Sequence, residues 1–293
     1  MAGIKSLFRD TAIYGVSSIV GRFINWCLVP MYTYCFTDAE YGVVTHIYAY
    51  VALVLTILTY GMETGFFRFA NHDRWQNPGQ VYTTTLTSIG VSSVLFIIAG
   101  CLLSADIAEW LECGAHPSFI WMMVIAVGVD AYTSIPFAYL RYRKRPVRFA
   151  TLKLINISLN IGLNLFFILL CPVIWQKAPQ WIEWFYDPSF GIGYIFMANL
   201  ISSLTVLLLL VPEIVAEDYS FSPRLLKEML RYSFPLLVLG IAGIMNQTID
   251  KILYPMLIPD KAEAMAGLGV YSANYKIAIV MVMFIQAFRF AYE

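Results

Sequence analysis

The amino-acid sequence predicts an all-α polytopic membrane protein with about eight transmembrane helices, each of roughly 20 residues. Composition is the first observation behind this prediction. Hydrophobic residues make up 59% of the chain and charged residues 13%, whereas soluble domains average about 25% charged residues. The second observation is that the hydrophobic residues gather into runs long enough to cross a bilayer. A formal net charge of zero gives no reason to expect a nucleic-acid partner.

Eight apolar runs define the expected helices. In order along the chain they cover residues 11–36, 41–67, 81–104, 118–140, 149–171, 193–210, 233–257 and 267–291. The polar lead before the first run lacks the short apolar core and the small-residue cleavage site of a signal peptide. We therefore expect the first run to be a membrane span.

Lysine and arginine residues indicate the orientation, because cytoplasmic loops of membrane proteins are enriched in them. Twelve lie in segments that would share one side of the membrane: Lys5, Arg9, Arg68, Arg74, Arg141, Arg143, Lys144, Arg145, Arg148, Arg224, Lys227 and Arg231. Only Lys177 and Lys261 lie in the opposite loops. We therefore predict a cytoplasmic N-terminus. The basic loop 140–149 is interpreted as a topology signal, with a lipid-headgroup site as the alternative.

The loops offer little for catalysis or metal binding. They are short, and no nucleophile, base or metal-ligand set accompanies their carboxylates. The five cysteines are scattered, without a C-x-x-C pair or a His-rich spacing. The sequence therefore predicts a protein that is not an enzyme and that has no metal site, no disulfide framework and no cofactor.

Arg22 lies near the middle of the first run. An arginine at the centre of a membrane span costs about 2.5 to 3.5 kcal/mol on insertion scales, so it normally faces a helix-bundle interior or a wet cavity. Two interpretations follow. Either Arg22 pairs with a carboxylate that holds helices together, or it forms an anion-binding site inside the membrane.

Three asparagines, Asn156, Asn160 and Asn164, recur every four residues in the fifth run, with Lys153 close to their cytoplasmic end. This spacing places them on one face of a helix. A stripe of amides facing lipid would be costly. Hydrogen bonds between helices and a polar cavity explain the stripe equally well.

Further polar residues lie in the other runs, and several share one depth. At 1.5 Å per residue, Arg22, Asp130 and Asn160 each lie roughly 17 Å from a helix end, near the midplane of a ~30 Å hydrocarbon core. The candidate substrate-binding residues of a cavity are Arg22, Lys276, Asn156, Asn160 and Asp130. The candidate gating residues or charge partners are Glu63, Asn246 and Asp250. For Asp250, a packing salt bridge to Lys251 or Lys276 is the alternative.

A weak internal repeat relates the beginning and the end of the chain. Val29-Pro30-Met31 in the first run resembles Tyr254-Pro255-Met256 in the seventh, and Phe67-Arg68-Phe69-Ala70 resembles Phe288-Arg289-Phe290-Ala291. Six helices separate the two copies, so they would have the same orientation, as in transporters with parallel repeats. We therefore expect a six-helix N-terminal lobe over residues 1–220 and the first two helices of a second lobe over residues 221–293. The chain is expected to be incomplete at its C-terminus.

Several linked motifs resemble a known family. In order they are FRDTAIYGVSSIVGRFINWCLVPMYT, GMETGFFRFA, PFAYLRYRKRPVRFATLKLINISLNIGLNLFF, LLKEMLRYSFPLLVLGIAGIMNQTIDKILYPM and GVYSANYKIA. They are similar to the polysaccharide transporters, which are oligosaccharide-lipid flippases of the multidrug/oligosaccharidyl-lipid/polysaccharide exporter superfamily. The resemblance implies a bacterial inner-membrane protein that moves an undecaprenyl-pyrophosphate-linked glycan toward the periplasm for surface polysaccharide or lipopolysaccharide biosynthesis. A coupling ion, Na+ or H+, is a further possible partner that it implies.

Two hypotheses about function follow. In the first, a cationic cavity carries the lipid-linked glycan by alternating between inward-open and outward-open states. In the second, the protein is a cation-coupled multidrug exporter of the same superfamily. Arg22 favours the first, because a fixed cation repels a cationic drug and attracts an anion. A non-transporting membrane scaffold is a third possibility, and it leaves the buried charges without a purpose.

Overall fold

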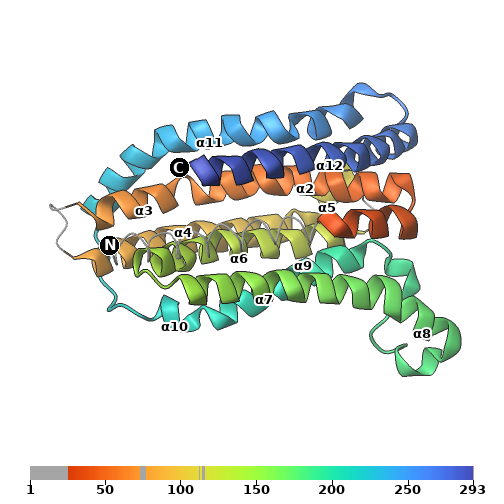
Figure 1. Cartoon of the computed structure of the whole chain (residues 1–293), viewed down its shortest axis with the longest axis horizontal. Coiled ribbons are helices and arrows are strands. Elements are labelled where there is room, and N and C mark those ends of the chain that lie inside the picture. The colour runs from red at the N-terminus through yellow and green to blue at the C-terminus, as the bar shows by residue number, and fades with distance from the viewer. Residues whose placement is uncertain (1–25, 73–76, 112, 114–115, 293) are drawn as a thin grey trace. The chain divides into compact units, whose positions relative to one another are not determined.

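The computed structural model describes residues 26–72, 77–111, 113 and 116–292, of which side chains are described up to residue 278 and at 281. Within these residues the chain is helical and contains no strand (Figure 1). Residues 26–35 are helical, and the α-helices that follow are α2 (Asp38–Thr59), α3 (Met62–Ala70), α4 (Pro78–Leu102), α5 (Ser104–Trp110), α6 (Pro117–Tyr142), α7 (Pro146–Leu165), α8 (Cys171–Lys177), α9 (Gly193–Leu209), α10 (Val211–Ile214), α11 (Pro223–Leu257) and α12 (Lys261–Tyr292). A π-helical turn, η1 (Phe166–Leu170), joins α7 to α8, and two 3-10 turns, η2 (Pro179–Trp181) and η3 (Pro188–Phe190), precede α9.

The predicted class is confirmed: the protein is an all-α, multi-pass membrane protein. Five helical segments of the described chain are long and apolar enough to cross a membrane: Asp38–Ala70, Pro78–Leu102, Pro117–Tyr142, Pro146–Lys177 and Pro223–Leu257. Gly193–Leu209 is a shorter apolar helix, and α12 covers the eighth predicted run. Residues 11–25 of the first predicted run lie outside the described residues.

The helix bounds differ from the predicted runs by several residues at many ends, and the second and seventh runs show the differences that have an evident structural cause. The second run is interrupted between α2 and α3, where Tyr60 (φ 29°) and Gly61 (φ 69°) have left-handed backbone conformations. A Cβ atom on Gly61 would lie 3.1 Å from the Ser233 carbonyl oxygen, so glycine suits both the backbone angle and the close approach of α11. The other difference is that α11 begins ten residues before the predicted run, at Pro223. Pro223 follows Ser222, whose hydroxyl accepts a hydrogen bond from the Leu225 backbone N–H.

The chain forms two compact units, each built from segments that are separate in sequence. Unit 1 comprises the described residues of Met1–Ile47, Ala150–Ser202 and Leu253–Glu293, and unit 2 comprises those of Tyr48–Phe149 and Ser203–Ile252. The division into lobes at residues 220 and 221 follows the repeat and stays a prediction.

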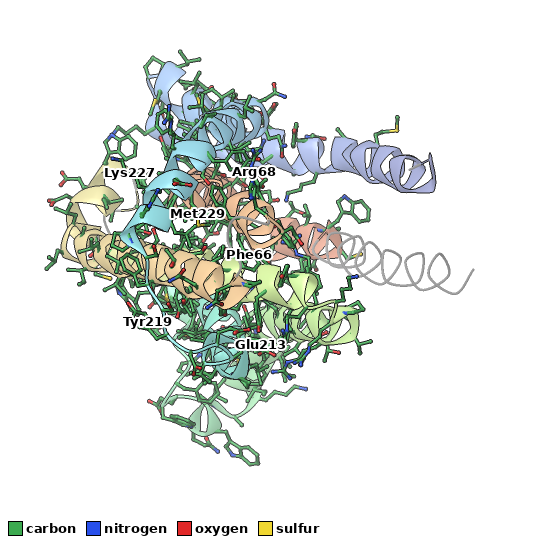
Figure 2. The ribbon with its side chains drawn as sticks, turned by 90° about the vertical axis from the view of Figure 1, so that its left-hand side faces the viewer. Phe66, Arg68, Glu213, Tyr219, Lys227 and Met229 are labelled. Atoms are coloured by element: carbon green, nitrogen blue, oxygen red, sulfur yellow. The ribbon has the colours of Figure 1, made fainter. Side chains whose placement is uncertain are left out.

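Unit 2 has its core where α3, α4, α6 and the start of α11 pack together. Met62, Phe66, Tyr82, Ile135 and Met229 are fully buried there. Figure 2 labels Phe66 of α3 and Met229 of α11, two of the buried side chains of this core. Because lipid tails are as apolar as these side chains, close packing rather than escape from water holds such helices together.

Unit 1 contains a close crossing of the first turns of α2 and the first turns of α12. A Cβ atom on Gly42 would lie 2.0 Å from the Met265 carbonyl oxygen, and one on Gly269 would lie 1.9 Å from the Asp38 carbonyl oxygen. Glycine at both positions therefore allows the two backbones to touch, as small residues do in membrane helix pairs.

The loop between α8 and α9, also in unit 1, packs through aromatic rings against the helical segments that flank it. Tyr194 stacks on Phe167 and on Tyr186, with ring centroids 4.9 and 5.1 Å apart. Trp181 and Trp184 project from this loop and are 74% and 84% exposed.

Candidate functional site

The described candidate residues fall into both units. Asn156, Asn160 and Lys276 belong to unit 1, and Glu63, Asp130, Asn246 and Asp250 belong to unit 2. Arg22, the central candidate for anion binding, lies outside the described residues.

In unit 1, the asparagine stripe of α7 joins three helices. The Asn164 side chain is fully buried, and its amide donates to the Asn160 backbone carbonyl (2.8 Å) and to Asn160 Oδ1 (3.2 Å). Asn164 Oδ1 accepts a hydrogen bond from the Tyr32 hydroxyl (3.0 Å), and Asn160 Nδ2 donates to Ser202 Oγ of α9 (3.4 Å). Asn156 is half-buried one turn away. The stripe thus contributes hydrogen bonds between helices, and a role of Asn156 and Asn160 in a cavity stays a prediction.

Tyr32 and Ser202 were not singled out from the sequence. Each is a polar side chain inside an apolar helix, which is a detectable signal, but neither shows a regular spacing that predicts its partner. Together with Asn160 and Asn164 they form a polar layer that we call the amide network.

Lys276 lies on α12 and is half-buried. Its backbone carbonyl accepts a hydrogen bond from Trp26 Nε1 at 3.0 Å, so the helix of residues 26–35 packs against α12. Arg22 lies four residues before Trp26 in the sequence. The contact involves the Lys276 backbone and not its ammonium group, so a role of Lys276 in a cavity stays a prediction.

In unit 2, Glu63 forms an ion pair with Arg141. Glu63 lies in the first turn of α3, directly after the left-handed pair Tyr60–Gly61, and Arg141 lies in the last turn of α6. Their side chains are 44% and 33% exposed, so solvent weakens the attraction. Glu63 was predicted as a charge partner, and this contact supplies a partner for it. A gating role stays a prediction.

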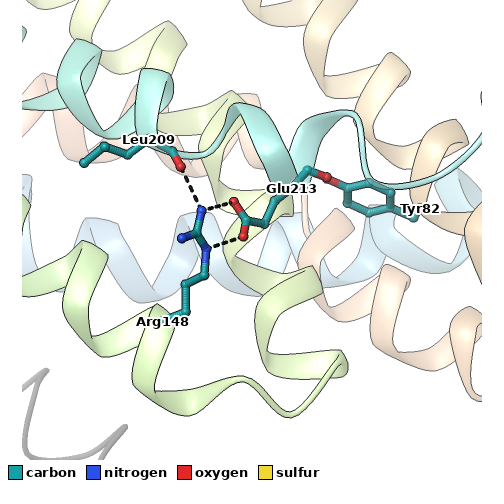
Figure 3. A network of polar contacts seen from close by, with 4 residues as sticks. All are labelled: Tyr82, Arg148, Leu209 and Glu213. Atoms are coloured by element: carbon teal, nitrogen blue, oxygen red, sulfur yellow. Dashed lines mark hydrogen bonds and ion pairs between the residues drawn. The ribbon is translucent and has the colours of Figure 1, made fainter.

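A second and more buried ion pair joins Arg148 of α7 to Glu213 of α10. Arg148 donates through Nε and Nη2 to the two carboxylate oxygens, and Nη2 also donates to the Leu209 backbone carbonyl at 3.2 Å (Figure 3). The Tyr82 hydroxyl donates to the Glu213 backbone carbonyl at 2.8 Å from the other side. Two parallel hydrogen bonds make such a pair strong and directional. Arg148 therefore has a structural partner in addition to its place in the basic loop.

The segment of residues 215–222, which we call the α10–α11 linker, is attached to α4 and α6. Glu217 accepts a hydrogen bond from the Tyr139 hydroxyl at 2.5 Å. The Thr83 hydroxyl donates to the Ser220 backbone carbonyl at 2.8 Å, and Gln80 Nε2 donates to Ser220 Oγ at 2.9 Å. The linker thereby joins the start of α11 to the core helices of unit 2. Figure 2 shows Glu213 and Tyr219 at this end of the unit.

The remaining candidates of unit 2 are less enclosed. Asp130 is half-buried, and its backbone carbonyl accepts a hydrogen bond from the Thr133 hydroxyl. Asn246 is exposed on α11. The Asp250 carboxylate lies 3.3 Å from Lys251 Nζ, which also donates to the Gln247 backbone carbonyl. Adjacent residues of a helix do not face each other, so this contact leaves open the choice between packing and gating for Asp250.

In a comparison with known protein families, residues 7–290 match a family described as polysaccharide biosynthesis protein. No curated protein and no solved structure matches the chain. The match extends over nearly the whole sequence and agrees with the resemblance carried by the sequence motifs. The chain therefore belongs to the polysaccharide biosynthesis protein family, as a multi-pass membrane protein.

Proposed function

We propose that the protein is a transporter that flips a lipid-linked oligosaccharide from the cytoplasmic to the periplasmic leaflet of a bacterial inner membrane. The observation that carries this proposal is the family match over residues 7–290 in a chain made of membrane-spanning helices. The substrate class is a polyprenyl pyrophosphate glycan that serves surface polysaccharide or lipopolysaccharide biosynthesis. Transport, rather than catalysis, is the activity that we assign.

The physical difficulty of this reaction is the charged headgroup. A pyrophosphate must leave water to cross the hydrocarbon, and the cost is prohibitive unless fixed cations and hydrogen-bond donors replace its hydration shell. Arg22 and Lys276 are the proposed cations, and Asn156, Asn160 and Asp130 are the proposed polar lining. The amide network supports this assignment, because it places amides and hydroxyls together on helices of unit 1.

The proposed mechanism is alternating access between a lobe of residues 1–220 and a second lobe that begins at residue 221. In this mechanism the headgroup stays near the midplane while the cavity opens first to the cytoplasm and then to the periplasm. Glu63, Asn246 and Asp250 are the proposed gating residues or charge partners. A coupling ion, Na+ or H+, would bias the direction.

The test uses cells whose only flippase for lipid-linked glycan is the full-length protein. Arg22→Ala should leave glycan on the cytoplasmic leaflet, and Arg22→Lys should retain part of the transport, because lysine keeps the charge but lacks the two-pronged guanidinium. Equal membrane abundance of both variants is the control. Wild-type transport by Arg22→Ala would overturn the anion-site proposal. Loss of cationic-drug resistance without glycan accumulation would instead favour the multidrug exporter.

A further inference from the structure

Apart from Arg143, Lys144 and Arg145 of the α6–α7 turn, which are exposed, and Lys251, which lies beside Asp250, the described basic residues of unit 2 fall into two groups. Arg141 and Arg148 bind the carboxylates of Glu63 and Glu213, and Arg224 lies 3.9 Å from Glu228. The second group consists of Arg68, Lys227 and Arg231, which are exposed. Within the described part of the chain, none of these three has a carboxylate within ion-pair distance.

Arg68 is held in place by an aromatic ring. Its guanidinium carbon lies 4.3 Å from the centroid of the Tyr232 ring, which in turn packs edge-on against Phe69. A cation over the face of a tyrosine ring is attracted by the ring's electrons, which restrains the guanidinium at this place. The guanidinium of Arg68 is therefore a positioned hydrogen-bond donor, although the side chain is exposed.

The first turns of α11 carry two further exposed cations, on the helix face next to the one that holds Tyr232. Lys227 and Arg231 are four residues apart and therefore share one helix face, about 6 Å apart along the axis. Arg231 directly precedes Tyr232, the residue on which Arg68 stacks. The opposite face is anchored in the core by Leu225 and Met229, both fully buried. Figure 2 shows Lys227 and Arg68 at this end of unit 2.

Exposed apolar side chains adjoin these cations. Leu230 is 40% exposed, and Phe234, one turn further along α11, is 65% exposed. The apolar surface continues with Val238 and Leu239. A basic turn followed by exposed apolar turns is the pattern of a helix that passes from the headgroup layer into the acyl layer.

We propose that Arg68, Lys227 and Arg231 form a binding site for the phosphate headgroup of an anionic phospholipid, with its acyl chains on Phe234 and Val238, which share the α11 face of Lys227 and Arg231. Arginine can donate two hydrogen bonds to phosphate oxygens at once, and lysine adds a compact charge. The apolar surface beside the cations selects a lipid over a soluble phosphate. This site is separate from the transported substrate and does not depend on the proposed function.

The test measures phosphatidylglycerol binding to the purified full-length protein in detergent by native mass spectrometry, with phosphatidylcholine as the neutral comparison. Each basic residue near a membrane surface strengthens anionic-lipid binding by about fivefold. The triple variant Arg68→Ala, Lys227→Ala, Arg231→Ala should therefore lose most of its preference for phosphatidylglycerol. The matched control removes three exposed cations of the α6–α7 turn, Arg143→Ala, Lys144→Ala and Arg145→Ala, and should keep the preference.

A charge-neutral variant distinguishes a built site from a diffuse positive field. Tyr232→Leu changes no charge and keeps an apolar side chain against the core, but it removes the ring under Arg68, so binding should weaken several-fold. Circular dichroism and gel filtration check that each variant remains folded. The proposal is overturned if both triple variants lose the preference equally, if Tyr232→Leu binds as the wild type does, or if glycerol 3-phosphate binds as tightly as the lipid.

Discussion

Gly42 and Gly269 lie opposite each other where α2 and α12 cross, and each leaves room for the backbone of the other helix. A Cβ atom on Gly269 would lie 1.9 Å from the Asp38 carbonyl oxygen and 3.1 Å from the Gly42 nitrogen. Because backbone rather than flexible side chains would meet the added atom, the helices would have to separate. The crossing is therefore sensitive to a single methyl group.

We predict that Gly42→Ala and Gly269→Ala each destabilise the protein by about 1 to 3 kcal/mol, the usual cost of overpacking. Thermal unfolding in detergent measures the effect. Gly162→Ala and Gly243→Ala are the matched controls, because nothing lies within 4 Å of a Cβ atom at either position. The controls should be neutral or slightly stabilising, since alanine favours the helix. Equal effects at all four positions would contradict the crossing.

The Arg148–Glu213 pair should respond unequally to loss of its two members. The Glu213 side chain is 5% exposed and that of Arg148 is 42% exposed. Arg148→Met leaves a buried carboxylate without its partner, at a cost of about 3 kcal/mol or more. Glu213→Gln leaves an arginine that water can reach, so we expect a smaller loss of about 1 kcal/mol.

The double variant Arg148→Met, Glu213→Gln should be more stable than Arg148→Met alone, because it carries no unpaired buried charge. Thermal unfolding again provides the measurement. Arg224→Met, at an exposed pair with Glu228, is the control and should change stability by less than about 0.5 kcal/mol. If the double variant is less stable than Arg148→Met, the other contacts of Glu213 contribute more to the free energy of unfolding than the removal of its unpaired charge does.

The asparagines of α7 should separate into structural and functional members. Asn164 is fully buried and makes three hydrogen bonds with Asn160 and Tyr32, so Asn164→Leu should cost about 1 to 2 kcal/mol of stability. Asn156 is only half-buried. Asn156→Leu should keep the unfolding temperature but impair transport if the residue lines a cavity. Normal transport by Asn156→Leu would remove it from the proposed site.

The orientation can be tested with introduced cysteines in a background that lacks Cys27, Cys35, Cys101 and Cys171. A membrane-impermeant thiol reagent applied to intact cells should label a cysteine at position 184, where the native Trp184 is 84% exposed, and should not label one at position 144. The reverse labelling would overturn the predicted cytoplasmic N-terminus.

Cys113, left in place, provides an internal control for accessibility. It lies in the loop before α6, and burial raises the pKa of its thiol to about 11. A raised thiol pKa means that the neutral, unreactive form prevails at neutral pH, and the reactive thiolate gains as pH rises toward 11. We expect little labelling of Cys113 at pH 7 and more at higher pH. Fast labelling at pH 7 would contradict its burial.

Substitution of Asp250 distinguishes a role in gating from a role in helix packing. Asp250→Asn keeps the size of the side chain and removes the charge that lies 3.3 Å from Lys251 Nζ. Lost transport at normal membrane abundance would favour gating, whereas lost abundance would favour packing. Lys251 is 8% exposed, so its ammonium depends on the few acceptors around it, which include the Gln247 carbonyl. Transport and abundance both equal to the wild type would exclude both roles.

The sequence by itself determined the helical membrane class, the order of the spans and the family. Each of these depends on local information: the length of an apolar run, the position of lysine and arginine along the chain, and the order of short motifs. A 20-residue apolar run has few stable alternatives to a helix in lipid, because every backbone polar group must be satisfied within the segment. The spacing of Asn156, Asn160 and Asn164 likewise determined that they share a face.

Only the tertiary structure decided which distant residues meet. Glu213 follows Arg148 by 65 residues and Asn164 follows Tyr32 by 132, and no periodicity connects either pair. The break at Tyr60–Gly61 also lies inside a continuous apolar run, and it becomes explicable through the approach of Ser233 and Leu236 from α11. Sequence patterns report how a residue relates to its own helix, whereas ion pairs, glycine crossings and the stacking of Arg68 on Tyr232 depend on how helices pack against one another.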